Sequence, residues 1–232
     1  MQIEVADRGE FKARMNDALA FDRRRAVVLT VDLQREYLDP SVGQSVVEPD
    51  EAARVLEANA RLLDACRAAD IRVVHAYVVR PPHDLEAGIQ DGGLAYTRAA
   101  REAGVSQAPH LPPRSRSDRA AGSPESEVPA HLVAESDIHV TSKKSLDGFA
   151  HTELDFLFSR VLRPRFVIVT GINTDTCVYA TTFSAANRGY WPIVVRDCVA
   201  SMRGRDSHEM ALELMSRSIA WVLGLDELLR RF

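Results

Sequence analysis

The 232-residue sequence has few cysteines and no long apolar run. Its three cysteines are too few, and odd in number, for a disulfide framework, and a chain of this length buries enough surface to fold without one. No apolar stretch approaches the roughly 18 residues of a membrane span, and the first residues lack the layout of a signal peptide. The sequence therefore predicts a cytoplasmic protein with free thiols and no membrane partner.

An excess of basic charge is also missing. The 29 Lys and Arg residues are outnumbered by 33 Asp and Glu residues, and the formal net charge is −4. Residues 23–25 are three consecutive arginines, but they lie just before an apolar run rather than among aromatic residues. Binding to nucleic acid needs a basic face. Nucleic acid is therefore not an expected partner.

Motifs for metal ions and nucleotide cofactors do not occur. The seven histidines form no HxH or HExxH pattern, and there is no CxxC pair. Neither GxGxxG nor GxxxxGKS/T is found, so nothing indicates a dinucleotide or nucleotide site. We expect no metal site and no cofactor.

What the sequence does contain is an alternation of short β-branched runs with segments of helical period. The expected strands are residues 26–32, 71–79, 137–141, 166–170 and 192–196. The expected helices are residues 51–69, 152–162, 176–188, 205–218 and 226–232. This alternation is typical of βα units. It predicts one α/β domain over residues 1–232, a three-layer αβα sandwich with Rossmann-like topology around a mostly parallel sheet of five or six strands.

Residues 80–129 interrupt the alternation. They are rich in proline, glycine and serine, so we expect a long irregular excursion with one helix near residues 94–102. Loops of this length inside a compact domain are uncommon and tend to be functional. The excursion is therefore expected to help shape a binding site.

Polar residues follow the expected strands at the points where the strands end. They are Asp32, Arg80, Lys143, the turn at residues 171–177, and Asp197. In parallel α/β sheets, ligands bind in the crevice outside the carboxyl ends of the strands. A carboxylate, an ammonium group and a thiol are thus expected at one edge of the sheet.

Each of these residues also has a simpler interpretation when it is taken alone. Cys177 is expected near a helix N-terminus, where the dipole favours a thiolate and backbone N–H groups can hold an oxyanion, but a buried small apolar residue also fits there. Asp32 alone fits a capping residue, and Lys143 alone fits a surface charge. Cys66 and Cys198 are expected in the core.

Three sequence blocks carry a family resemblance. Residues 31–34 resemble a first-strand D-x-Q, residues 143–154 resemble K-x5-F-x2-T-x-L, and residues 170–178 resemble the nucleophile turn T-G-x5-C-V. In order and spacing, these blocks resemble the isochorismatase-like cysteine hydrolases over about residues 24–224. The resemblance implies the αβα fold of that family.

The resemblance also implies roles for particular residues. Cys177 would be the nucleophile, Asp32 the general base and Lys143 the cation that completes the triad. The family places a cis peptide in the nucleophile turn, which here joins Ile172 to Asn173. The backbone N–H groups of Asn173 and Cys177 would then form the oxyanion hole.

The implied reaction is cleavage of the C–N amide bond of a small carbamoyl, ureido or carboxamide substrate. It would proceed through a thioester and release ammonia or an amine, in a homodimer or homotetramer. An enol-ether hydrolase of the isochorismatase type and a non-catalytic oligomeric member remain as alternatives, although the presence of Cys177 favours C–N cleavage. The candidate substrate-binding residues are Gln34, Tyr37, Arg80, Phe149, His151, Arg203 and Arg205.

Overall fold

The computed structural model describes residues 5–87, 95–115 and 119–232. At its centre lies a six-stranded sheet in the order β3-β2-β1-β4-β5-β6, in which every neighbouring pair is parallel. The strands are β1 (Ala26–Val31), β2 (Arg72–Ala76), β3 (Ile138–Val140), β4 (Phe166–Ile172), β5 (Trp191–Ala200) and β6 (Trp221–Leu223). The predicted α/β fold around a parallel sheet is therefore confirmed.

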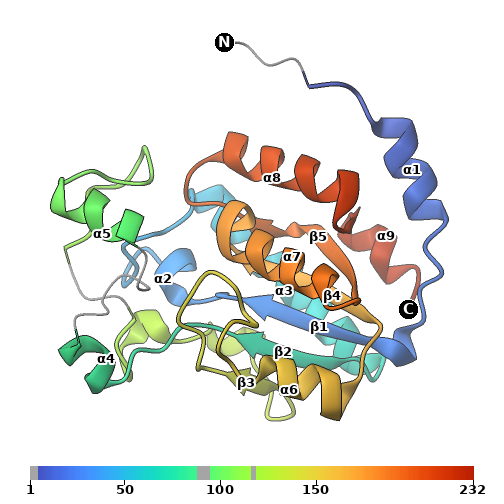
Figure 1. The fold of residues 1–232 in the computed structure, drawn as a ribbon, viewed down its shortest axis with the longest axis horizontal. Coiled ribbons are helices and arrows are strands. Elements are labelled where there is room, and N and C mark those ends of the chain that lie inside the picture. Colours follow the sequence, from blue (N-terminus) through green and yellow to red (C-terminus); the bar gives the residue numbers. More distant parts are fainter. Residues whose placement is uncertain (1–4, 88–94, 116–118) are drawn as a thin grey trace.

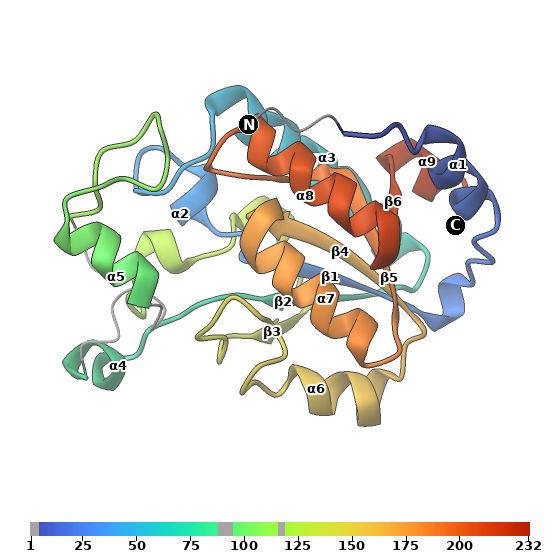
Figure 2. The ribbon, with the colours of Figure 1, turned by 45° about the horizontal axis from the view of Figure 1, so that its top comes forward.

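Helices cover both faces of this sheet (Figures 1 and 2). One face packs against α3 (Pro49–Ala68) and α9 (Leu225–Leu229). The other packs against α6 (Leu154–Phe156) with its continuation Leu157–Leu162, α7 (Tyr179–Asn187) and α8 (Arg205–Ser218). Alternate β1 residues enter the two apolar layers, which explains the continuous apolar run in the sequence. No helix in the described ranges is long and apolar enough to cross a bilayer.

Several boundaries differ from the expected ones. Strand β2 ends at Ala76, because Val78 already forms an antiparallel bridge with Ser142. Strand β5 continues to Ala200, because the β4–β5 register shifts after Val169 and the strand pairs again beyond the shift. Strand β6 was not expected as a separate strand. Neither was α1 (Gly9–Asp17), which has no buried residue.

The excursion lies beyond the carboxyl ends of the strands (Figure 1). It contains α4 (Pro82–Glu86) and α5 (Ala95–Glu102), and it faces the short helix α2 (Arg35–Leu38) that follows β1. Helix α5 confirms the helix expected near residues 94–102, although position 94 lies outside the described residues. The backbone at the start of the excursion is joined to a later part of it, because Arg80 N donates to Arg119 O at 2.9 Å.

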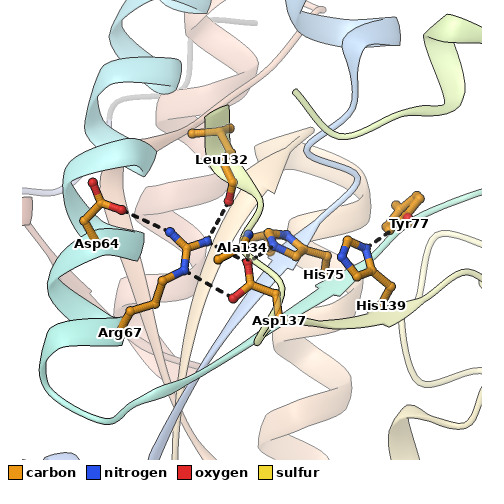
Figure 3. Close-up of polar contacts among 9 residues, drawn as sticks. Asp64, Arg67, His75, Tyr77, Leu132, Ala134, Asp137 and His139 are labelled. Carbon is orange, nitrogen blue, oxygen red and sulfur yellow. Dashed lines mark hydrogen bonds and ion pairs between the residues drawn. The ribbon is translucent and has the colours of Figure 1, made fainter. Parts of the chain in front are cut away.

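A polar network fastens the β3 edge of the sheet (Figure 3). The buried carboxylate of Asp137 accepts a hydrogen bond from Arg67 of α3 at 2.6 Å and lies 3.2 Å from His75 Nε2. The other ring nitrogen of His75 lies 2.7 Å from Thr30 Oγ1 of β1. Burial lowers the pKa of His75 to about 4, so the ring is neutral at pH 7. His139 stacks on it with 5.1 Å between ring centroids.

Candidate active site

Asp32 follows β1 directly and is fully buried. Its φ of +49° turns the chain out of the sheet, a backbone conformation that aspartate tolerates better than most residues. The turn is held by hydrogen bonds from Asp32 N to Ala76 O at 2.9 Å and from Gln34 N to Asp32 O at 2.8 Å. The carboxylate is thereby fixed at the carboxyl end of the central strand.

Lys143 reaches this carboxylate from the loop after β3. It is fully buried, and its Nζ donates to Asp32 Oδ2 at 2.7 Å. Burial by itself lowers the pKa of Lys143, but the neighbouring Asp32 raises it through its charge and its hydrogen bond, and the resulting pKa is raised. The lysine is therefore a permanent cation. Its neighbour Lys144 points elsewhere, with Nζ 3.0 Å from Asp84 Oδ2.

Cys177 lies in the helical turn Thr174–Val178 between β4 and α7 and is 6% exposed. Burial, followed by the charge of Asp32, raises the pKa of its thiol to about 12, and the charge of Lys143 opposes them. This raised pKa opposes the thiolate that a position near a helix N-terminus was expected to favour. A hydrogen bond with the Asp32 side chain is a further cause of the raised pKa of this thiol.

The backbone of the nucleophile turn has two special features. Gly171 has a φ of +116°, and a Cβ at this position would lie 1.9 Å from Val31 O. Only glycine lets β4 pass this close to the end of β1. The peptide bond between Ile172 and Asn173 is cis, as the family resemblance implied.

Asp32, Lys143 and Cys177 share one cavity of about 400 Å³. Its described lining contains several cationic side chains. They are Arg80, Arg114, Arg119, Lys143, Lys144 and Arg203, whereas Asp32 is the acidic residue. Apolar and aromatic surface is supplied by Tyr37, Val78, Ala95, Tyr96, Leu146 and Met202. The cavity therefore combines a thiol, a carboxylate, cationic groups and apolar surface.

Three of the seven candidate substrate-binding residues line this cavity, namely Tyr37, Arg80 and Arg203. Arg203 also joins two parts of the wall, because its guanidinium lies 3.3 Å from Asp175 Oδ2 and donates to Gln107 Oε1 at 3.0 Å. One of these partners belongs to the nucleophile turn and the other to the excursion.

The structure does not bring the other four to the cavity wall. Gln34 is buried beneath it and donates to the carbonyls of Val78 and Ser126 at 2.8 and 2.6 Å. Phe149 packs in the core among other aromatic rings. His151 is exposed at a left-handed turn, and the Arg205 side chain is 84% exposed. Asp197 lies within β5 and accepts a hydrogen bond from the backbone of α9, so it too is outside the cavity.

Sequence reasoning missed Arg119. Its Nη1 donates to Tyr37 Oη at 2.8 Å and to Gln34 Oε1 at 3.3 Å, and the residue is 7% exposed. Its charge is one of the influences that lower the pKa of Cys177. No sequence pattern marks a single arginine in a polar loop. Its place depends on how the excursion folds back over the sheet.

The described residues contain no group of three or more His, Cys, Asp or Glu side chains that could hold a metal ion. Cys66 and Cys198 are free thiols in the core, at the face of the sheet that α3 covers. Burial raises the pKa of both. Of the three thiols, Cys177 alone lines the cavity among the described residues.

Comparison with known proteins gives three findings. The model of the isochorismatase domain matches residues 26–227. The ureidoacrylate amidohydrolase of Methylorubrum extorquens is 28% identical over 208 residues, 89% of this chain and 82% of that protein, and the maleamate amidohydrolase of Pseudomonas putida is 27% identical over 206 residues, 88% and 85%. A cysteine hydrolase from Pseudomonas syringae superposes with a TM-score of 0.70 at 23% identity, covering 92% of this chain and 94% of its own.

Proposed function

The chain belongs to the isochorismatase family, and we propose that within this family it is a cysteine-dependent amidohydrolase. The observation that carries the proposal is the meeting of Asp32, Lys143 and Cys177 in one cavity, with the carboxylate and the ammonium group 2.7 Å apart. Nucleophile, base and stabilising cation are the parts that acyl transfer requires. The amidohydrolase names of the two relatives support the same reaction.

The first half of the proposed reaction forms a thioester. Asp32 Oδ1 takes the proton of the Cys177 thiol while Sγ attacks the amide carbonyl carbon. The carbonyl oxygen becomes an oxyanion, which the backbone N–H groups of Asn173 and Cys177 bind. The C–N bond then breaks, and protonated Asp32 gives its proton to the leaving nitrogen, so ammonia or an amine departs. Lys143 keeps its charge and holds the Asp32 carboxylate in place.

The second half returns the enzyme to its starting state. Asp32, again a carboxylate, takes a proton from water, and the hydroxide attacks the thioester carbonyl. The C–S bond breaks, the acid is released, and the proton held by Asp32 returns to the thiolate of Cys177. Because the pKa of this thiol is raised, reprotonation is favourable at pH 7.

We propose a small carbamoyl, ureido or carboxamide substrate that also carries a carboxylate. Arg80, Arg119 and Arg203 bring guanidinium groups to the cavity of the nucleophile. A guanidinium group has five N–H donors. Such groups bind carboxylates with two parallel hydrogen bonds. The volume of about 400 Å³ fits a small molecule.

The proposal extends to the setting of the enzyme. We place it in the cytoplasm, because its three cysteines are free thiols, which a reducing compartment preserves. We also expect a homodimer or homotetramer. Large apolar side chains that remain exposed on the helices over one face, such as Phe156, Phe183 and Met210, support assembly.

Ammonia release from a panel of ureido and carboxamide acids tests this function. Cys177→Ser is expected to abolish release at unchanged fold, and Cys66→Ala, which alters a buried thiol outside the cavity, to retain it. Full activity of Cys177→Ser would refute the proposal. If Asp32→Asn stopped turnover of an enol ether and Cys177→Ala did not, an enol-ether hydrolase would replace it. No turnover on either panel would indicate a non-catalytic member.

A further inference from the structure

The nucleophile turn is held from outside by the segment that joins β5 to α8. Three successive side chains of the turn each have a partner in residues 201–208. The contacts are Asn173 Oδ1 with Met202 N at 2.8 Å, Thr174 Oγ1 with His208 Nδ1 at 2.8 Å, and Asp175 Oδ1 with Ser201 Oγ at 2.7 Å. Residues 201–208 come well after the turn in the sequence, and their contacts fix its orientation.

The Thr174–His208 contact differs from the other two. It joins two side chains that are both buried, with Thr174 0% and His208 7% exposed, and His208 belongs to the long helix α8. Met202 and Ser201 belong to the connection before that helix. Because this contact is shielded from water, hydrogen bonds to water do not readily replace it. Thr174 therefore ties the turn to a rigid element of the fold.

We propose that His208 is a positioning residue for the nucleophile. Its bond to Thr174, three residues before Cys177, fixes the turn so that the thiol and the backbone N–H groups of Asn173 and Cys177 keep their positions at the cavity. His208 touches none of the reacting atoms. Oxyanion stabilisation depends on donors held in place before the reaction, so a turn that loses one anchor loses rate rather than substrate affinity. This inference rests on the proposed amide hydrolysis.

Thr174→Val tests the role with almost no change of side-chain volume. We expect kcat to fall by about tenfold, less than the 10²–10³-fold loss typical of a deleted oxyanion-hole donor, with KM within about twofold of the wild-type value. Thr174→Ser restores the hydroxyl and is expected to restore kcat. The matched control is Thr182→Val on α7, because Thr182 is equally buried and its Oγ1 has no hydrogen-bond partner in the described ranges. The control is expected to keep the wild-type kcat.

Variants of the partner complete the test. His208→Ala is expected to lower kcat as Thr174→Val does, whereas His208→Asn, which places a polar atom near the position of Nδ1, recovers part of the rate. The double variant Thr174→Val/His208→Ala is expected to be no slower than the slower single variant, because both changes remove the same bond. Urea unfolding of every variant shows whether the protein remains folded under the assay conditions.

The outcomes separate the two proposals. A wild-type chain that hydrolyses no amide on the panel refutes the proposed function and this inference with it. An active wild type whose Thr174→Val variant keeps kcat within twofold, or loses no more than Thr182→Val, refutes the positioning role alone. So does a folded Thr174→Ser variant that remains as slow as Thr174→Val.

Discussion

Replacing Lys143 by methionine tests whether the buried pair at the centre of the site is charged. Methionine keeps much of the length and apolar stem of lysine but removes the ammonium group that lies 2.7 Å from Asp32 Oδ2. Both side chains are buried, at 1% and 0% exposure. The variant therefore leaves a carboxylate in the interior without its counter-ion, which is among the most destabilising changes a fold can undergo.

The size of the effect follows from the geometry. At 2.7 Å and an effective dielectric constant of about 20, the attraction between two unit charges is about 6 kcal/mol. Relaxation and entry of water reduce this, and removing one partner of a buried pair typically costs about 3–5 kcal/mol. We expect the free energy of unfolding to fall by that amount. The loss is a large part of the roughly 5–15 kcal/mol that holds a protein folded.

Two further variants isolate the charge effect. Lys143→Met/Asp32→Asn removes both charges and is expected to be more stable than Lys143→Met by about 2 kcal/mol or more, because no lone charge remains buried. Lys144→Met is the matched control for stability. Its side chain is 36% exposed and its ammonium group pairs with Asp84, so its loss is expected to cost at most about 1 kcal/mol.

Urea unfolding at pH 7, followed by circular dichroism with a common m value, measures the wild type, these three variants and the single variant Asp32→Asn. The reasoning is refuted if Lys143→Met costs no more than Lys144→Met. It is also refuted if the double variant is less stable than Lys143→Met by the full cost of Asp32→Asn, since independent additive losses would mean that the two charges do not interact.

Two other predictions follow from the pKa shifts. Asp32→Asn is expected to stop amide hydrolysis but to speed alkylation of Cys177 by iodoacetamide at pH 8, because burial and then the charge of Asp32 raise the pKa of this thiol while Lys143 lowers it. Mass spectrometry with Cys66 as internal reference measures this, and equal or slower alkylation contradicts it. For His75, burial lowers the pKa from 6.5 to about 4. Between these values the unfolded chain takes up a proton that the folded chain does not, so the free energy of unfolding decreases as the pH is lowered. Between pH 7 and 5 the wild type is expected to lose about 2 kcal/mol more than His75→Gln, and an equal loss in urea unfolding contradicts this.

Short-range patterns were enough to predict most of the fold. Helix α8 has the predicted bounds, because a repeated apolar stripe and a preceding glycine are local signals. The extension of β5 and the strand β6 were not predictable in this way. The first depends on a shift of register against β4, and the second is three residues long, too short to carry a period.

In the candidate site, too, local patterns predict some features and only packing decides others. Asp32, Lys143 and Cys177 each follow a strand, so their approach could be expected from the geometry of parallel sheets. The raised pKa of Cys177 could not, because its largest cause is burial, and burial depends on what covers the turn. The position of Phe149 could not be predicted either, because the packing of α6 and α7 places it in the core and not in the cavity.

By itself, the sequence determined the order of strands and helices, the glycine turn before Cys177, and the three residues at the strand ends. These depend on contacts within a few residues and on the fixed geometry of βα units. The tertiary structure alone decided the cavity wall and the anchoring of the nucleophile turn, through Arg119 folding back from the excursion and His208 reaching Thr174 from α8. Such contacts join segments far apart in the chain, and only packing of the whole domain decides which of them meet.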